Sequence, residues 1–92
     1  MANNVELTAT ASSDLSVATG LRIVYWLYVR TGGTGGAWSL EDGTDDSGTV
    51  KLDGSMAAND KEFFPFVPPL EFKSGIFFDI GGTNTNMTVG YS

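Results

Sequence analysis

The chain has 92 residues, the length of one small domain, of which 41% are hydrophobic and 17% are charged. This composition excludes a disordered chain and suffices for one modest core. Eleven acidic residues against five basic ones leave a formal net charge of −6, a sign that disfavours nucleic acid as a partner.

The residue types that are missing restrict the chemistry further. Without cysteine there is no disulfide or thiolate nucleophile, and without histidine the usual general base and the commonest metal ligand are absent. No apolar run is long enough to span a membrane, and the first residues lack the basic and apolar regions of a signal peptide. We therefore expect a soluble domain that is not an enzyme, holds no cofactor and has no membrane partner.

The first part of the chain, residues 1–19, is rich in serine, threonine and alanine. A weak alternation at Val5, Leu7 and Ala9 predicts either an edge strand or an extended arm that orders against a partner. We treat residues 1–19 as this N-terminal arm or edge strand and residues 20–92 as the folded domain.

The clearest element in the sequence is the ten-residue segment Leu21–Arg30, which predicts a long strand. If its alternation is regular, Leu21, Ile23, Tyr25, Leu27 and Val29 share one face and Arg22, Val24, Trp26, Tyr28 and Arg30 share the other. Large apolar groups stand on both faces, so we expect both to be covered.

The rest of the chain reads as short strands between turns rich in glycine, aspartate and proline. Val50 and Leu52 are expected to point inward, and Ser55–Glu62 is the one weak helix candidate. The proline-containing run Phe63–Pro69 is expected either at a sheet edge or crossing between sheets. The other expected strands cover residues 38–41, 49–53, 70–73, 76–80 and 87–91. The prediction is an all-β fold, a single small antiparallel β-sandwich, jelly-roll-like or barrel-like, of about seven or eight strands with an extended N-terminal arm.

Two groups of acidic residues were considered for chemistry. Asp42, Asp45 and Asp46 form a glycine-flanked turn that could offer oxygen ligands to Ca²⁺, but a plain turn explains the same residues and is favoured. Glu41 or Glu71 could face Asp79 as a glycosidase pair, and here solvated surface charge is favoured. Neither group leads us to expect a metal site or a catalytic site.

The aromatic residues are more informative. Six phenylalanines fall within residues 63–78, and Trp26 and Tyr28 lie on the second face of the long strand. Most of these rings must form the core, but two aromatic faces exceed the need of so small a domain. We predict a partner interface that contains Trp26, Tyr28, Phe63, Phe64 and Phe66.

Carbohydrate stacking on exposed Trp26, Tyr28 or Trp38 is an alternative use of the same rings. Charge is uneven as well, because residues 41–62 hold seven acids and two lysines, a local −5 of the total −6. We expect this acidic end to face solvent.

An ordered series of turns and strands carries a resemblance to a known family. The series contains Gly20-Leu21, Trp38-x-Leu40-x-Asp42-Gly43, Gly48-Thr49, Phe64-Pro-Phe66, Leu70-x-Phe72-x-x-Gly75-Ile76, Gly82-Thr83-Asn84 and Thr88-Val89-x-Tyr91. Over residues 20–92 it resembles small β-sandwich virion proteins of tailed bacteriophages, of the head decoration (cement) or head-fibre type.

The resemblance implies a capsid decoration protein on the virion surface, made in the host cytoplasm. Its implied partners are the major capsid protein and further copies of itself, with a trimer favoured, and its mechanism would be to stabilise adjacent capsomers. The alternatives are a tail, baseplate or fibre component, and a carbohydrate-binding module for a host-surface glycan. The family has no catalytic residues to transfer.

Overall fold

The computed structural model describes residues 6–81 and 84–92, and all regular structure in them is β. The eight strands are β1 (Leu7–Ala11), β2 (Leu15–Thr19), β3 (Arg22–Thr31), β4 (Gly36–Asp42), β5 (Thr49–Met56), β6 (Lys61–Phe72), β7 (Gly75–Ile80) and β8 (Thr85–Tyr91). Across these described residues there is no helix, and so none that could cross a membrane. The helix candidate Ser55–Glu62 was wrong: its first residues end β5, its last begin β6, and Asn59 turns between them with a φ of 55°.

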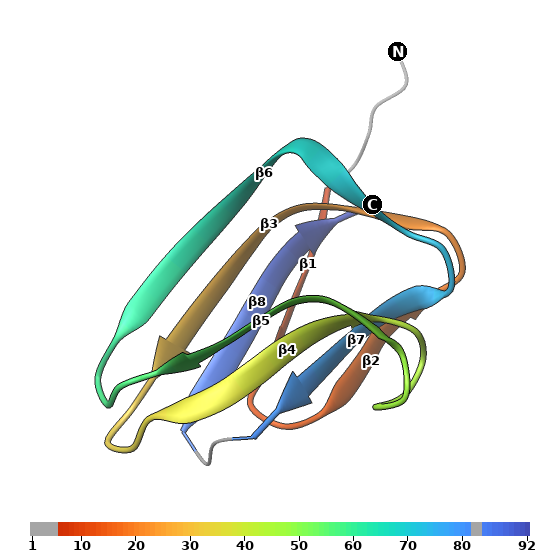
Figure 1. Cartoon of the computed structure of the whole chain (residues 1–92). Coiled ribbons are helices and arrows are strands. Elements are labelled where there is room, and N and C mark those ends of the chain that lie inside the picture. The colour runs from red at the N-terminus through yellow and green to blue at the C-terminus, as the bar shows by residue number, and fades with distance from the viewer. Residues whose placement is uncertain (1–5, 82–83) are drawn as a thin grey trace.

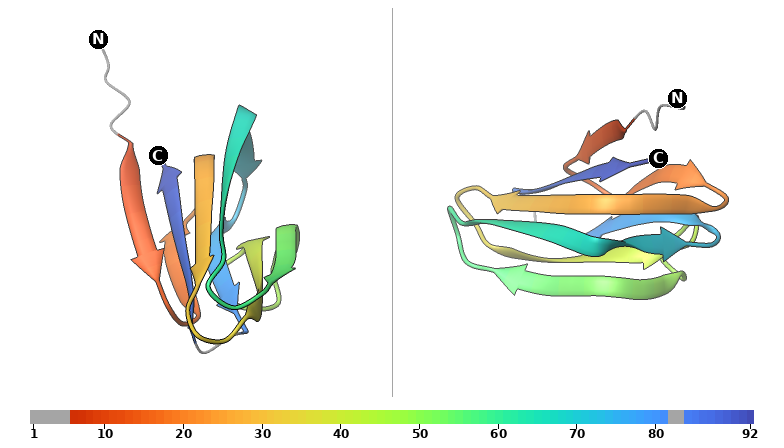
Figure 2. Two further views of the ribbon diagram at one scale, coloured as in Figure 1. Left: turned by 90° about the vertical axis from the view of Figure 1, so that its left-hand side faces the viewer. Right: turned by 90° about the horizontal axis from the view of Figure 1, so that it is seen from above.

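The strands form two four-stranded antiparallel sheets that pack face to face (Figure 1). The first sheet has the order β1-β8-β3-β6 and lies farther from the viewer in Figure 1; we call it the front sheet because it carries the aromatic patch described below. The second, which we call the back sheet, has the order β2-β7-β4-β5 and lies nearer the viewer. The chain crosses between the sheets at every connection except the β4–β5 hairpin. This is the double Greek-key order of a jelly roll, so the predicted sandwich is confirmed. The molecule is elongated, with extents of 43 × 26 × 18 Å (Figure 2).

The described part of the N-terminal segment belongs to the sandwich. β1 pairs with β8 at one edge of the front sheet, with Leu7 opposite Tyr91, and β2 pairs with β7 at one edge of the back sheet. The jelly roll therefore starts at Leu7. The expected alternation at Val5 lies outside the described residues.

A β-bulge changes which face of β3 looks inward. Between Val24 and Trp26 the pairing with β8 moves by one residue, from Tyr91 to Gly90, so β3 holds one extra residue at Tyr25. Val24 is buried before the bulge, and Leu27 and Val29 are buried after it. The prediction of one regular alternation from Leu21 to Val29 was therefore wrong, because a single inserted residue exchanges the two faces.

A second bulge has the same effect in β5. Leu40 pairs with Leu52 but Glu41 pairs with Val50, which leaves Lys51 as the extra residue. Val50 consequently lies on the outer side of the back sheet and is 50% exposed, so the inward placement predicted for it was wrong. Leu52, before the shift, packs against the core as predicted.

The proline-rich run lies at a sheet edge, as predicted. β6 pairs with β3 on one side and is the last strand of the front sheet. Pro65, Pro68 and Pro69 lie in this strand, where a missing N–H costs least and blocks pairing with another chain. Val67, inside an irregular stretch of the pairing, is 92% exposed.

The core lies between the sheets and contains aliphatic and aromatic side chains from both. Phe72 and Phe78 are its largest fully buried residues. The Trp38 ring packs on Phe64 across the sandwich at a centroid distance of 5.5 Å. Trp38 is only 3% exposed, so the expectation that it could stack on a carbohydrate was wrong. Leu40, two residues further along β4, lies on the same face of the strand and is fully buried, so this face points into the core.

Candidate functional site

Three aromatic rings lie together on the outer side of the front sheet, and we call Trp26, Tyr28 and Phe63 the aromatic patch. Tyr28 and Phe63 are direct neighbours across β3 and β6, on the face opposite to buried Leu27. Trp26 packs on Phe63 with ring centroids 5.8 Å apart. Phe63 is 54% exposed, and Trp26 and Tyr28 are half-buried.

The backbone of β8 supplies the surface on which the Trp26 indole lies. Trp26 pairs with Gly90, and a Cβ atom on Gly90 would stand 2.2 Å from the indole Nε1. The ring therefore occupies the space of the missing side chain, which explains why Gly90 is buried on an outer face. The indole N–H donates to Glu6 Oε2 at 3.3 Å, which fixes the orientation of the ring.

Two basic side chains border the aromatic patch. Arg30 and Lys61 are exposed, lie opposite each other across β3 and β6, and share the face of Tyr28 and Phe63. Neither side chain forms a hydrogen bond or an ion pair with another described residue. Like charges directly opposite across two strands oppose pairing, so this arrangement does not serve the fold. We call Arg30 and Lys61 the basic rim; Asp60 borders it.

The structure divides the five residues predicted for the partner interface into two groups. Trp26, Tyr28 and Phe63 form the aromatic patch. Phe64 points to the other side of β6, toward Trp38, and Phe66 is partly buried against the core. The strand alternation of β6 separates Phe63 from Phe64, and sequence reasoning treated these neighbours as one group.

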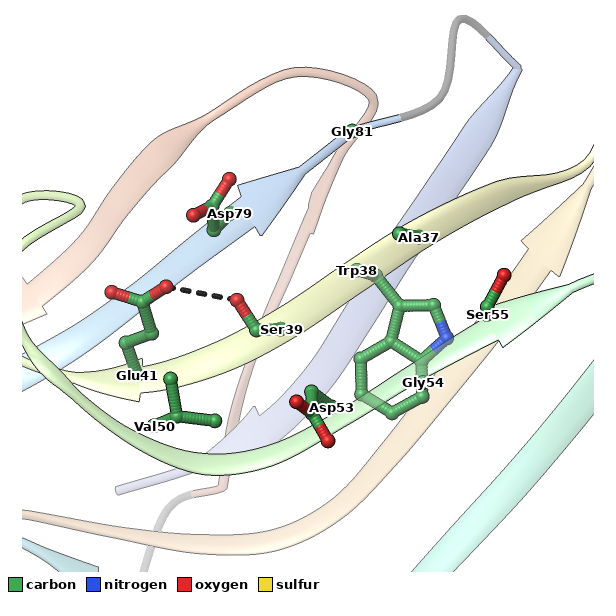
Figure 3. A pocket seen from close by; sticks show the side chains of 10 residues that line it. All are labelled: Ala37, Trp38, Ser39, Glu41, Val50, Asp53, Gly54, Ser55, Asp79 and Gly81. Carbon is green, nitrogen blue, oxygen red and sulfur yellow. Dashed lines mark hydrogen bonds between the residues drawn. The ribbon is translucent and has the colours of Figure 1, made fainter.

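The outer side of the back sheet, on the opposite side of the sandwich, carries a groove of about 630 Å³. Asp79 stands on β7, Ser39 and Glu41 on β4, and Val50 and Asp53 on β5 (Figure 3). Ser39 is the register partner of both aspartates, so acidic residues of three adjacent strands line the same groove. We call this the acidic groove. Its remaining lining is largely apolar and includes the edge of the Trp38 indole and the methyl group of Ala37.

Glu41 is the unusual group in the acidic groove because it is only 2% exposed. Its Oε2 accepts a hydrogen bond from Ser39 Oγ at 2.8 Å, while its Oε1 is buried without a hydrogen-bond partner and points away from Ser39 (Figure 3). Burial raises the pKa of Glu41, and the neighbouring Asp79 and Asp46 carboxylates raise it further against the opposing effect of Ser39. A buried acid of this kind is a candidate for ligand contact or proton uptake.

The other acids named in the sequence have different surroundings. Partial burial alone would raise the pKa of Asp42, but hydrogen bonds from the backbone N–H groups of Lys73 and Ser74, at 2.9 and 2.7 Å, lower it. Asp45 accepts bonds from Ser47 inside its own turn. Within the described residues, no three acids form a group that could hold a metal ion. Of the glycosidase candidates, Glu41 lies beside Asp79, while Glu71 is on β6 in the front sheet.

Comparisons with known proteins identify no family for this chain. No protein-family model matches the chain, and no curated protein matches it. Among solved structures it is similar to chains described as "Structure of infectious bursal disease virus Gx strain" and "Structure of infectious bursal disease virus Gt strain". The identities are 20% and 22%, the TM-scores 0.25 and 0.24, and 100% and 95% of this chain is covered. The chain spans only 23% and 26% of the matched chains.

Proposed function

We propose that this chain is a structural protein of a virion, a capsid decoration (cement) protein of a tailed bacteriophage that binds the shell as a homo-oligomer. The observation that supports this role most directly is the aromatic patch on the outer side of the front sheet. Trp26, Tyr28 and Phe63 offer the aromatic surface that is enriched in the centres of protein interfaces. A patch built on two long paired strands is rigid, so little conformational entropy is lost on docking.

The jelly-roll architecture suits such a role. It buries a complete core without metal or disulfide, and its edge strand β6 is protected against strand addition by three prolines. Residues 20–92 resemble phage head proteins, and this resemblance suggests that the aromatic patch binds a phage capsid. On the shell, many weak identical contacts between copies and major capsid protein would stabilise neighbouring capsomers together.

Binding to particles tests the proposal. Full-length protein is mixed with particles from which the native copies have been stripped, and the bound fraction and the heat stability of the particles are measured. We expect Trp26→Ala and Phe63→Ala each to weaken binding by about tenfold or more, as interface anchors do. Val67→Ala is the matched control, since Val67 is exposed but lies outside the patch. Unchanged binding by both patch variants, or particles that gain no heat stability, would contradict the proposal.

A carbohydrate-binding module is the second candidate, because exposed aromatic rings also stack on sugars. With Trp38 in the core, Trp26 and Tyr28 of the aromatic patch remain of the three rings predicted for this purpose. Glycan-array binding that is lost in Trp26→Ala would favour this candidate over cement. A tail, baseplate or fibre component is separated from cement by its copy number in the particle.

A further inference from the structure

Two charged surfaces of this chain lack partners among its described residues, and they lie on opposite sides of the sandwich. The acidic groove on the back sheet has the buried Oε1 of Glu41 without a fixed partner, next to Asp79. The basic rim on the front sheet has Arg30 and Lys61 side by side; Asp60 borders them, but neither basic side chain is hydrogen-bonded or ion-paired to a described residue. Buried acceptors that lack a donor and like charges held together both cost stability, so each surface is compatible with a ligand of opposite charge.

We propose that the acidic groove receives the Arg30 or Lys61 side chain of a second copy of this chain. The inference rests on the homo-oligomer of the proposed function and deepens it by naming the two surfaces in contact. A guanidinium or ammonium group would donate to Asp79 and to the buried Glu41 oxygen, and its alkyl stem would lie along Val50 and the Trp38 edge.

The charge distribution favours a second copy as the occupant. The chain carries a net charge of −6, so identical molecules repel one another unless a basic surface of one meets an acidic surface of the next. Arg22 is engaged with the Thr19 carbonyl, and Lys51 lies over the Phe72 ring at 5.7 Å. Arg30 and Lys61 are the cations that stand together and face outward.

The contact is heterologous, because the rim of one copy meets the groove of the next. Such a contact closes into a ring when its rotation fits a small number of copies and otherwise extends as an open chain. A closed ring of three copies agrees with the trimer that the phage resemblance implies. In a closed ring each copy would use both its basic rim and its acidic groove, and neither surface would remain exposed.

Mixing two neutralised variants tests this arrangement with the purified full-length protein. Arg30→Gln with Lys61→Gln removes the rim, and Glu41→Gln with Asp79→Asn removes the groove, while each variant keeps the other surface intact. Sedimentation velocity over a concentration series, at low and high ionic strength, measures association. Lys73→Gln and Glu71→Gln are controls, since both residues are exposed and lie outside the two surfaces.

We expect the wild type to associate more strongly at low ionic strength, and each double variant alone to lose at least about tenfold in affinity. A mixture of the two double variants should form a 1:1 pair and nothing larger, because one intact rim meets one intact groove. Circular dichroism melts verify that the variants fold. If the double variant Glu41→Gln with Asp79→Asn does not fold, the single variant Asp79→Asn replaces it.

A wild type that stays monomeric throughout, control variants that weaken association equally, or a mixture that forms no pair would overturn the inference. These results leave the proposed function open to its own test. Particles that still require Trp26 for binding while the protein is monomeric would show that the aromatic patch faces the shell and not a second copy.

Discussion

Glu41→Gln removes the negative charge from the most buried acid of the chain and keeps its shape. In the wild type, Oε2 is bonded to Ser39 and Oε1 is buried without a fixed partner. A glutamine retains the acceptor for Ser39, and its amide N–H₂ can donate toward Asp79. Leaving a buried polar group without a partner costs about 1–3 kcal/mol, and we expect the substitution to recover a gain of this order at neutral pH. In a domain of this size each kcal/mol corresponds to a rise of about 4–8 °C in Tm.

The stability gain from Glu41→Gln should depend on pH. The pKa of folded Glu41 lies above its ordinary value of 4.5 because of burial and then its acidic neighbours. Folded protein therefore holds this proton more tightly than unfolded protein, and the associated stability is present below pH 4.5 and is lost as the pH rises through the folded pKa. The advantage of Glu41→Gln over wild type should be smallest near pH 4 and grow toward pH 8.

Thermal melts at equal, low protein concentration between pH 4 and pH 9 measure this difference. Glu71→Gln is the matched control, because Glu71 is exposed and should show no such trend. A Glu41→Gln variant that is less stable than wild type at pH 8, or a difference that does not change with pH, would refute the account of a destabilising buried carboxylate.

Three further substitutions test the fold by thermal or urea melts. Gly75→Ala should cost about 1–3 kcal/mol of stability from backbone strain, because Gly75 has a φ of 145°, and more from crowding, because its Cβ would stand 2.5 Å from the Ala18 carbonyl oxygen. Gly33→Ala is the control and should change stability little, because the space around Gly33 is open. Equal effects of the two variants would contradict this prediction. Asp42→Asn should destabilise the protein by about 1.5–3 kcal/mol at neutral pH, because the Asp42 carboxylate accepts two backbone N–H bonds. The stability difference from wild type should shrink below pH 3.8, as the pH approaches the lowered pKa of Asp42. A stability difference that stays constant with pH would contradict this prediction. Gly90→Ala should displace the Trp26 indole and so shift the tryptophan fluorescence spectrum. An unchanged spectrum would show that the indole ring does not lie on Gly90.

Much of the fold was predictable because it depends on local residue patterns. Turn residues between short apolar runs gave the strand number, and the prolines of β6 placed that strand at an edge. The errors in which face of a strand looks inward come from two bulges, near Tyr25 in β3 and at Lys51 in β5. A bulge depends on how a strand pairs with its neighbours, and neither segment contains a residue type that predicts the inserted residue.

The surfaces were predictable only in part, for a related reason. Trp26, Tyr28 and Phe63 could be named from aromatic content, but their separation from Phe64 required the register between β3 and β6. Arg30 and Lys61 are thirty-one positions apart in the chain, and only strand pairing makes them neighbours. Glu41 and Asp79 were considered as a pair, but the burial of Glu41 is a property of the assembled sheet, and its sequence surroundings resemble those of a solvated acid.

The central claim is that this chain is an abundant component of a phage shell, and its copy number per purified particle tests that claim most directly. Quantitative mass spectrometry of the particles, with labelled peptides of this chain and of the major capsid protein, gives the ratio. The account predicts a copy number of the same order as the major capsid protein. Only a few copies per particle would move the chain to the tail or a fibre, and its absence from purified particles would contradict the proposed function.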